Sequence, residues 1–190
     1  MSGDETVTYR TDPRRSRFTV RAFAGGMLSM LAHSPTFAVR EFEGEAELAP
    51  GGALENASLR LRAGADSLEL TDNMSEKDRR EIARTMREDV LETGRYPDIV
   101  FEATGISADK ITEGWYRANI TGDLTLHGVT NRCSFGAQVW LTPETLRAQG
   151  EFALRQTDYN IRLVSAAGGT IKVKDELRFS FDIMCNKEGG

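Results

Sequence analysis

Histidine and cysteine are scarce in this sequence, and the few that occur are not spaced like metal ligands. Two histidines, His33 and His127, and two cysteines, Cys133 and Cys185, occur among 190 residues. A zinc or iron site would therefore need Asp, Glu or Cys for most of its ligands. No H-x-H, H-E-x-x-H or paired-cysteine spacing is present. We expect no metal site, and two small buried thiols rather than a disulfide, while contact between the two thiols stays open.

Long apolar runs and an excess of positive charge are also missing. No stretch is long enough for a membrane-spanning helix, so we expect no stable membrane insertion. Residues 1–17 are polar and lack the apolar centre of a signal peptide, which predicts a cytoplasmic location, or a periplasmic one if a leader was removed. A formal net charge of -5 and a pI near 5.2 argue against a nucleic-acid-binding surface.

The motifs of several enzyme classes are incomplete. In the segment GMLSM (26–30) the G-x-S-x-G elbow is incomplete, and the paired glycines at 51–52 and 168–169 lack a P-loop lysine and predict turns. His127 precedes a glycine, and Asp123 lies about 13 Å away along the same strand, so a turn residue is favoured over a general base. We expect no catalytic residues and a protein that is not an enzyme. An enzyme acting on a bound lipid is the least favoured alternative.

Alternation of apolar and polar residues, the two-residue period of a half-buried strand, dominates the chain. The clearest case is 57–63, in which Ala57, Leu59, Leu61 and Ala63 share one face. Further strands are expected over 17–23, 36–48, 98–104, 114–126, 130–141, 145–155, 159–164 and 169–185. Short connections between so many strands predict a single antiparallel sheet, closed into a barrel or folded into a sandwich.

One amphipathic helix, about 75–93, interrupts the strands, and a short helical turn is expected over about 25–32. Ser75 is placed to cap the helix, with Asp78 three residues later, and Gly94 follows its end. Its apolar stripe comprises Ile82, Ala83, Met86 and Val90. Its charged face contains two pairs at four-residue spacing, Glu76 with Arg80 and Arg84 with Glu88.

Large apolar residues at alternate positions of different strands would all face the interior of such a sheet. They are Leu59, Leu61, Ile99, Phe101, Leu124, Leu126, Phe135, Phe152, Leu154, Phe179 and Phe181. The pattern alone leaves open whether they fill a plain core or line a hollow barrel that holds one small ligand. His33 could close a helix C-terminus or project a polar group into a pocket mouth.

Several segments together resemble one known family. The strongest is ITGDLTLHGVTNRCSF (120–135), joined by YPDIVFEA (96–103), FALRQTDYNI (152–161) and GGTIKVKDELRFSFDI (168–183). The N-terminal stretch 16–45 agrees more loosely, with His33 where members often carry a histidine. These segments resemble the YceI family, a group of lipocalin-like polyisoprenoid-binding proteins. The charged helix is longer than the corresponding segment of most members, and many members carry an export signal that is not visible here.

The resemblance implies an eight-stranded lipocalin-like barrel over residues 9–185, with flexible termini at 1–8 and 186–190. It further implies non-enzymatic binding, transport or sequestration of a long apolar lipid, an isoprenoid chain such as a polyprenyl lipid or a quinone tail. The eleven apolar residues would line the pocket, and His33 would lie at its mouth. No cofactor is expected, apart from a bound isoprenoid or other long-chain lipid as the ligand. The alternative is a filled barrel that acts as an interaction module through a homodimer or a protein partner.

Overall fold

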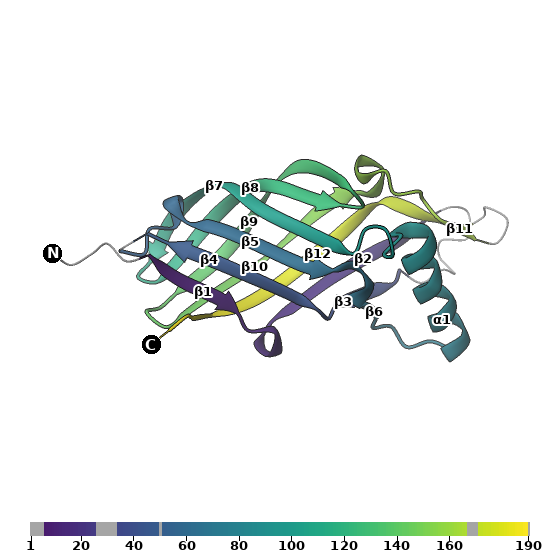
Figure 1. Ribbon diagram of the computed structural model, residues 1–190, viewed down its shortest axis with the longest axis horizontal. Coiled ribbons are helices and arrows are strands. Elements are labelled where there is room, and N and C mark those ends of the chain that lie inside the picture. Colours follow the sequence, from purple (N-terminus) through teal and green to yellow (C-terminus); the bar gives the residue numbers. More distant parts are fainter. Residues whose placement is uncertain (1–5, 26–33, 50, 167–170, 190) are drawn as a thin grey trace.

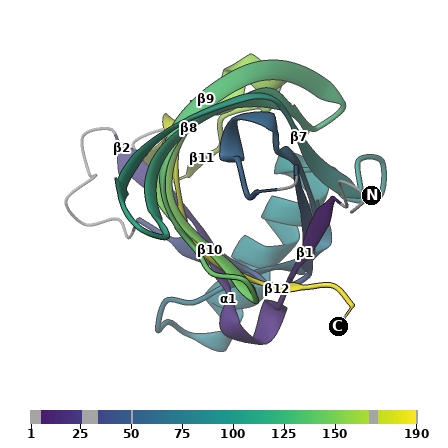
Figure 2. The same cartoon turned by 90° about the vertical axis from the view of Figure 1, so that its left-hand side faces the viewer.

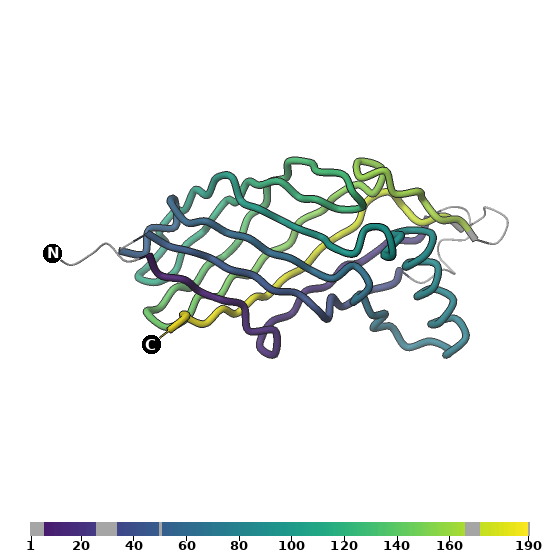
Figure 3. The backbone as a smooth tube through the Cα atoms, viewed as in Figure 1, coloured from purple at the N-terminus to yellow at the C-terminus, as the bar shows by residue number. Residues whose placement is uncertain are grey.

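The computed structural model describes residues 6–25, 34–49, 51–166 and 171–189, and β-strands make up most of it (Figures 1 and 3). The strands are β1 (Val7–Thr11), β2 (Arg17–Gly25), β3 (Thr36–Val39), β4 (Phe42–Leu48), β5 (Ser58–Gly64), β6 (Leu68–Leu70), β7 (Asp98–Thr112), β8 (Trp115–Leu126), β9 (Val129–Leu141), β10 (Thr145–Arg155), β11 (Ser165–Ala166) and β12 (Ile171–Lys187). The helical segments are α1 (Glu76–Thr85), the π-helix η5 (Met86–Val90), and the 3-10 turns η1 (Pro13–Arg15), η3 (Leu54–Asn56), η4 (Ala65–Ser67) and η6 (Gln156–Tyr159).

Eight strands form a closed ring. Their hydrogen-bonded order is β1-β4-β5-β7-β8-β9-β10-β12, and β12 returns to β1 through the partners Tyr9–Lys187 and Thr11–Cys185. The neighbours in this ring are antiparallel. The ring is seen from one end in Figure 2. The predicted mainly β fold with a closed eight-stranded antiparallel barrel is therefore confirmed.

The barrel is less regular at the end that carries the helix. There β12 pairs with β2 instead of β1, and β2 continues the sheet to β3 and β6. This change of partner breaks the single strand predicted over 36–48 into β3 and β4. The ladder between β5 and β7 ends at the pair Gly64–Asp98. The next strand, β6, pairs with β3 and not with β7. Helix α1 lies beside β3 and β6 at this end, opposite the two chain termini (Figure 1).

Helix α1 begins where the sequence predicts. The Ser75 hydroxyl accepts a hydrogen bond from the Asp78 amide at 3.1 Å, which caps the first turn. The helix passes into η5, and Leu91 closes that turn through the Met86 carbonyl. The predicted pair Arg84–Glu88 is present, with nitrogen and oxygen 3.2 Å apart.

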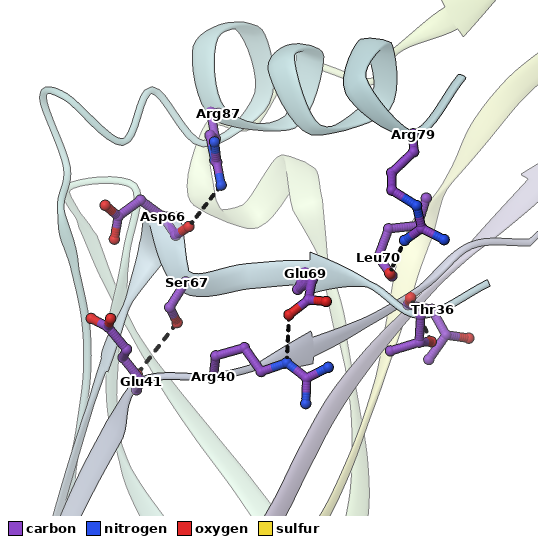
Figure 4. Close-up of polar contacts among 10 residues, drawn as sticks. Thr36, Arg40, Glu41, Asp66, Ser67, Glu69, Leu70, Arg79 and Arg87 are labelled. Carbon is purple, nitrogen blue, oxygen red and sulfur yellow. Dashed lines mark hydrogen bonds and ion pairs between the residues drawn. The ribbon is translucent and has the colours of Figure 1, made fainter. Parts of the chain in front are cut away.

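Two arginines attach the helix to the strands beneath it (Figure 4). Arg79 donates to the Leu70 carbonyl at 2.5 Å and to the Asp72 carbonyl at 2.8 Å, and Arg87 donates to the Asp66 carbonyl at 3.5 Å. Because Arg79 turns toward the sheet, its Nε lies 3.9 Å from Glu76. The predicted pairing of Glu76 with Arg80 is thus replaced by one with Arg79.

Other differences from the sequence predictions have local causes. Residues 159–164 form no strand, because η6 ends at Asn160 in the left-handed conformation (φ 56°) and the chain then runs irregularly to β11. Strand β7 runs to Thr112, well beyond the predicted 98–104, and β1 and β6 were not predicted. The strands begin at Val7 and end at Lys187, within the segments for which flexible termini were expected. Residues 26–33, which include His33 and most of the expected helical turn, Gly168–Gly169, and the terminal residues 1–5 and 190 lie outside the described residues.

Candidate ligand-binding cavity

Phenylalanine side chains from several strands meet on the inner face of the barrel. Phe152 and Phe179 are direct partners in the β10–β12 ladder, and their rings stack 4.7 Å apart and nearly parallel, at 7°. Phe135 of β9 stacks on Phe152 at 5.0 Å, and Phe101 of β7 lies 5.3 Å from Phe135. Since alternate residues of a strand point to the same face, the register lines up these rings as a band around the interior.

This band borders an internal cavity of about 850 Å³. Small-molecule sites usually span roughly 300 to 1,000 Å³ and are lined mainly by apolar groups. The barrel is therefore hollow, which the alternation pattern could not decide. Ten of the residues predicted to face a pocket line the cavity: Leu59, Leu61, Ile99, Phe101, Leu124, Leu126, Phe135, Phe152, Phe179 and Phe181.

Leu154, the remaining residue of that set, is not among the lining residues. It is buried, 9% exposed, and borders a second pocket of about 420 Å³ together with Cys133 and Tyr159. The ladder between β9 and β10 stops at Gly150, four residues before Leu154. Leu154 stays paired with Leu177 of β12, so at this position β10 has a neighbour strand on one side only.

The helix contributes lining residues that the predicted set did not include. Ile82, Met86 and Val90 of the predicted apolar stripe face the cavity, whereas Ala83 does not line it. The strands near the helix add Val20, Phe37 and Val39. The 3.6-residue period of the helix and the alternation of 17–23 place most of these residues on an apolar face, and so could have indicated them as lining residues.

Polar lining residues gather mainly where the helix meets the barrel. Asn73, Ser75, Asp78, Glu81 and Thr85 come from α1 and the segment before it, and Ser165 and Lys172 come from β11 and β12. At the opposite end, the connection between β4 and β5, dark blue in Figure 2, folds across the barrel with Leu54 buried at 5% exposure. The cavity thus has an apolar interior and a polar rim at the helix end.

His127 occupies the turn between β8 and β9, as predicted. His127 and Gly128 both have positive φ, 51° and 72°, and a Cβ on Gly128 would lie 2.5 Å from the Tyr96 ring. The His127 side chain is 8% exposed, with Nδ1 3.1 Å from the Tyr159 carbonyl oxygen and Nε2 2.7 Å from a Glu92 carboxylate oxygen. These contacts hold three connections together, and His127 does not line the cavity.

The opening strand of that hairpin has the predicted polar outer face. Asp123 pairs with Arg132 at 3.3 Å across the two strands, and Thr125 and Thr130 share a hydrogen bond at 2.7 Å. Their neighbours Leu124 and Leu126 line the cavity. This strand therefore forms part of the cavity wall.

Both thiols are free and line the cavity. Burial raises the pKa of Cys133, and the Asp123 carboxylate adds to the effect. Burial also raises the pKa of Cys185, partly opposed by the Thr11 hydroxyl. Neither environment activates a thiolate, since a reactive cysteine has a lowered pKa.

The described residues contain no cluster of three or more His, Cys, Asp or Glu side chains that could hold a metal ion. No helix among them is both long and apolar enough to cross a membrane.

Comparisons with known proteins agree with this architecture. The profile of the YceI-like domain family matches residues 9–185. The chain belongs to this family. No curated protein matches the chain.

Among solved structures, BcnA from Burkholderia cenocepacia is similar at a TM-score of 0.69, with 16% identity over 92% of this chain and 98% of that one. A polyisoprenoid binding domain from Saccharophagus degradans gives a TM-score of 0.64, with 13% identity over 94% and 97% of the two chains. A mutant CJ YCEI protein gives 0.60, with 13% identity over 80% and 85%. At such identities the likeness of this YceI-like chain to these proteins establishes a shared fold.

Proposed function

We propose that this YceI-like protein binds a long apolar lipid, an isoprenoid chain such as a polyprenyl lipid or a quinone tail, within its barrel and without catalysing a reaction. The observation that carries the proposal is the cavity of about 850 Å³, lined by phenylalanine and aliphatic side chains. A cavity with so much apolar lining gains free energy when a hydrocarbon chain replaces water. The polyisoprenoid binding domain with the same fold supports the choice of an isoprenoid.

The energetics are sufficient for useful affinity. Each buried methylene-sized group contributes about 0.8 kcal/mol, so ten such carbons contribute roughly 8 kcal/mol before costs. Immobilising the flexible chain offsets a large part of this gain. A longer chain than ten carbons would therefore reach micromolar affinity, which corresponds to about -8 kcal/mol. The length and width of the cavity would set the specificity.

The orientation of the ligand follows from the distribution of polar groups. The chain would lie along the phenylalanine band, and its polar end would lie among the Ser75, Thr85 and Ser165 side chains at the helix end. A hydroxyl or carbonyl headgroup can form hydrogen bonds with these side chains. Among the phenylalanine rings it would have no hydrogen-bond partner, which costs free energy.

Binding of geranylgeraniol, measured by equilibrium partitioning of the radiolabelled lipid, tests the proposal. Phe179→Arg puts a charge into the cavity wall and should abolish binding. Ser180→Arg makes the same substitution at the next residue, outside the cavity lining, and should leave binding unchanged. Ala148→Phe, which fills part of the cavity without charge, should weaken binding even if Phe179→Arg fails to fold. Unchanged uptake by folded Phe179→Arg and Ala148→Phe would refute the proposal.

A further inference from the structure

The wall of the barrel is incomplete between β9 and β10. These strands pair only from Leu141 to Ala137 on β9, opposite Leu146 to Gly150 on β10. Beyond this point β9 stays paired with β8 down to Val129, and β10 stays paired with β12 up to Arg155. The Phe135 and Phe152 rings still stack across this line at 5.0 Å, and beyond them residues 129–134 and 153–155 border a seam without a ladder across it. The same register, continued, would have placed Cys133 opposite Leu154.

The turn η6 closes this seam through side-chain hydrogen bonds. Asn131 of β9 donates from Nδ2 to the Asp158 carbonyl at 2.6 Å, and the His127 ring lies 3.1 Å from the Tyr159 carbonyl. Tyr159 itself is 2% exposed. A few such bonds hold a segment less firmly than a continuous ladder, because local opening then requires the loss of few hydrogen bonds.

A pocket lies on the seam and shares one wall residue with the cavity. It measures about 420 Å³ and is lined by Asn131, Arg132, Cys133, Ala153, Leu154, Asp158 and Tyr159. Cys133 also lines the internal cavity. The interior and the outer pocket are thus separated at this point by a single layer of side chains.

We propose that the seam between β9 and β10 is a lateral opening of the cavity, with η6 as its plug, through which the apolar ligand exchanges. This inference rests on the proposed function for the identity of the ligand. The opening itself depends only on β9, β10 and η6, so it can also be tested in protein without ligand.

The two native thiols report on the opening. Their relative rates with a sulfonated methanethiosulfonate reagent are measured by peptide mapping. In protein loaded with geranylgeraniol, Cys133 should react at least about fivefold faster than Cys185, which is 5% exposed and lines the filled cavity without bordering the outer pocket.

Three variants separate the seam from other routes. Asn131→Ala removes the bond to η6 and should accelerate both Cys133 labelling and lipid release by about fivefold, the factor for one ordinary hydrogen bond. Ala153→Phe fills the outer pocket from an exposed position and should slow both rates. Ser134→Ala, the matched control on the same strand, removes only a 2.7 Å bond to Thr121 on the outer face and should change neither.

Lipid release is measured as transfer of tritiated geranylgeraniol to an excess of phosphatidylcholine vesicles. Equal labelling of Cys133 and Cys185 in the loaded protein would overturn the proposal. Transfer rates that are the same in Asn131→Ala, Ala153→Phe and the parent protein would overturn it as well. If geranylgeraniol does not bind, the proposed function fails, while the effect of Ala153→Phe on Cys133 labelling in the empty protein still decides whether the seam opens.

Discussion

At the scale of single residues, His127 and Tyr159 show how the connections at one end of the barrel are held. The Tyr159 carbonyl only accepts hydrogen bonds, so the His127 Nδ1 at 3.1 Å donates to it. The other ring nitrogen faces the Glu92 carboxylate at 2.7 Å, and the ring packs edge-on against Tyr96. One side chain therefore joins the helix end, the β8–β9 turn and η6.

His127→Asn should lower the free energy of unfolding by about 1 to 3 kcal/mol, because asparagine tolerates the positive φ but cannot span both partners. Urea denaturation measures this change. Thr130→Ala, which removes one exposed hydroxyl pair of the same hairpin, is the control and should cost less than about 1 kcal/mol. An equal loss in the two variants would contradict the role assigned to His127.

Burial raises the pKa of Tyr159 to about 12, with smaller contributions from Cys133 and Asp158. The unfolded chain ionises this phenol near 10.0, so its contribution to stability is complete below that pH and is lost as the pH rises toward about 12. Tyr159→Phe should flatten the dependence of the unfolding free energy on pH in that window. A phenylalanine variant with the same alkaline slope as the parent would show that Tyr159 titrates normally.

At the scale of elements, the helix covers the end at which the barrel ladder is interrupted. Arg79 donates to two carbonyls of the β6 region and thereby fixes α1 over the polar rim of the cavity (Figure 4). Hydrogen bonds from a charged donor contribute more than neutral ones, about 1.5 to 3 kcal/mol each. Arg79 thus makes two of the three arginine hydrogen bonds that attach the helix, and Arg87 makes the third, to the Asp66 carbonyl.

Arg79→Met should increase amide hydrogen exchange in α1 while leaving the ladders β8–β9 and β10–β12 protected. The expected loss of local stability is about 1 to 3 kcal/mol, since methionine keeps the apolar stem but not the donors. Arg80→Met, a change at an exposed neighbour on the same helix, is the matched control. If Arg79→Met increased amide hydrogen exchange equally in the barrel and in α1, Arg79 would not be a local attachment of the helix.

Local patterns predicted most strands and the helix, but not the places where pairing changes. Alternation in 36–48 could not indicate the break before Phe42, because it results from β12 changing partner between β1 and β2. The segment 159–164 alternates like a strand, yet Asn160 ends a 3-10 turn there, with the Thr157 amide and hydroxyl bonded to Asp175. Both features depend on residues distant in sequence.

At the scale of the whole molecule, closure of the ring creates the cavity. Sequence alternation identified ten of its lining residues, but not its volume, because the width of a barrel depends on strand number and stagger, which are tertiary quantities. Leu154 is not among these lining residues: it keeps its pairing with Leu177 of β12, but the ladder to β9 ends at Gly150. Periodicity within one strand does not show where that strand loses one of its two neighbours.

The content of the cavity tests the central claim most directly. The protein would be purified under native conditions, extracted with organic solvent, and the extract analysed by mass spectrometry, with Phe179→Arg purified in parallel as the control. The account predicts a stoichiometric isoprenoid from the parent protein and none from the variant. An empty extract, together with no uptake of added quinones or polyprenols, would contradict it.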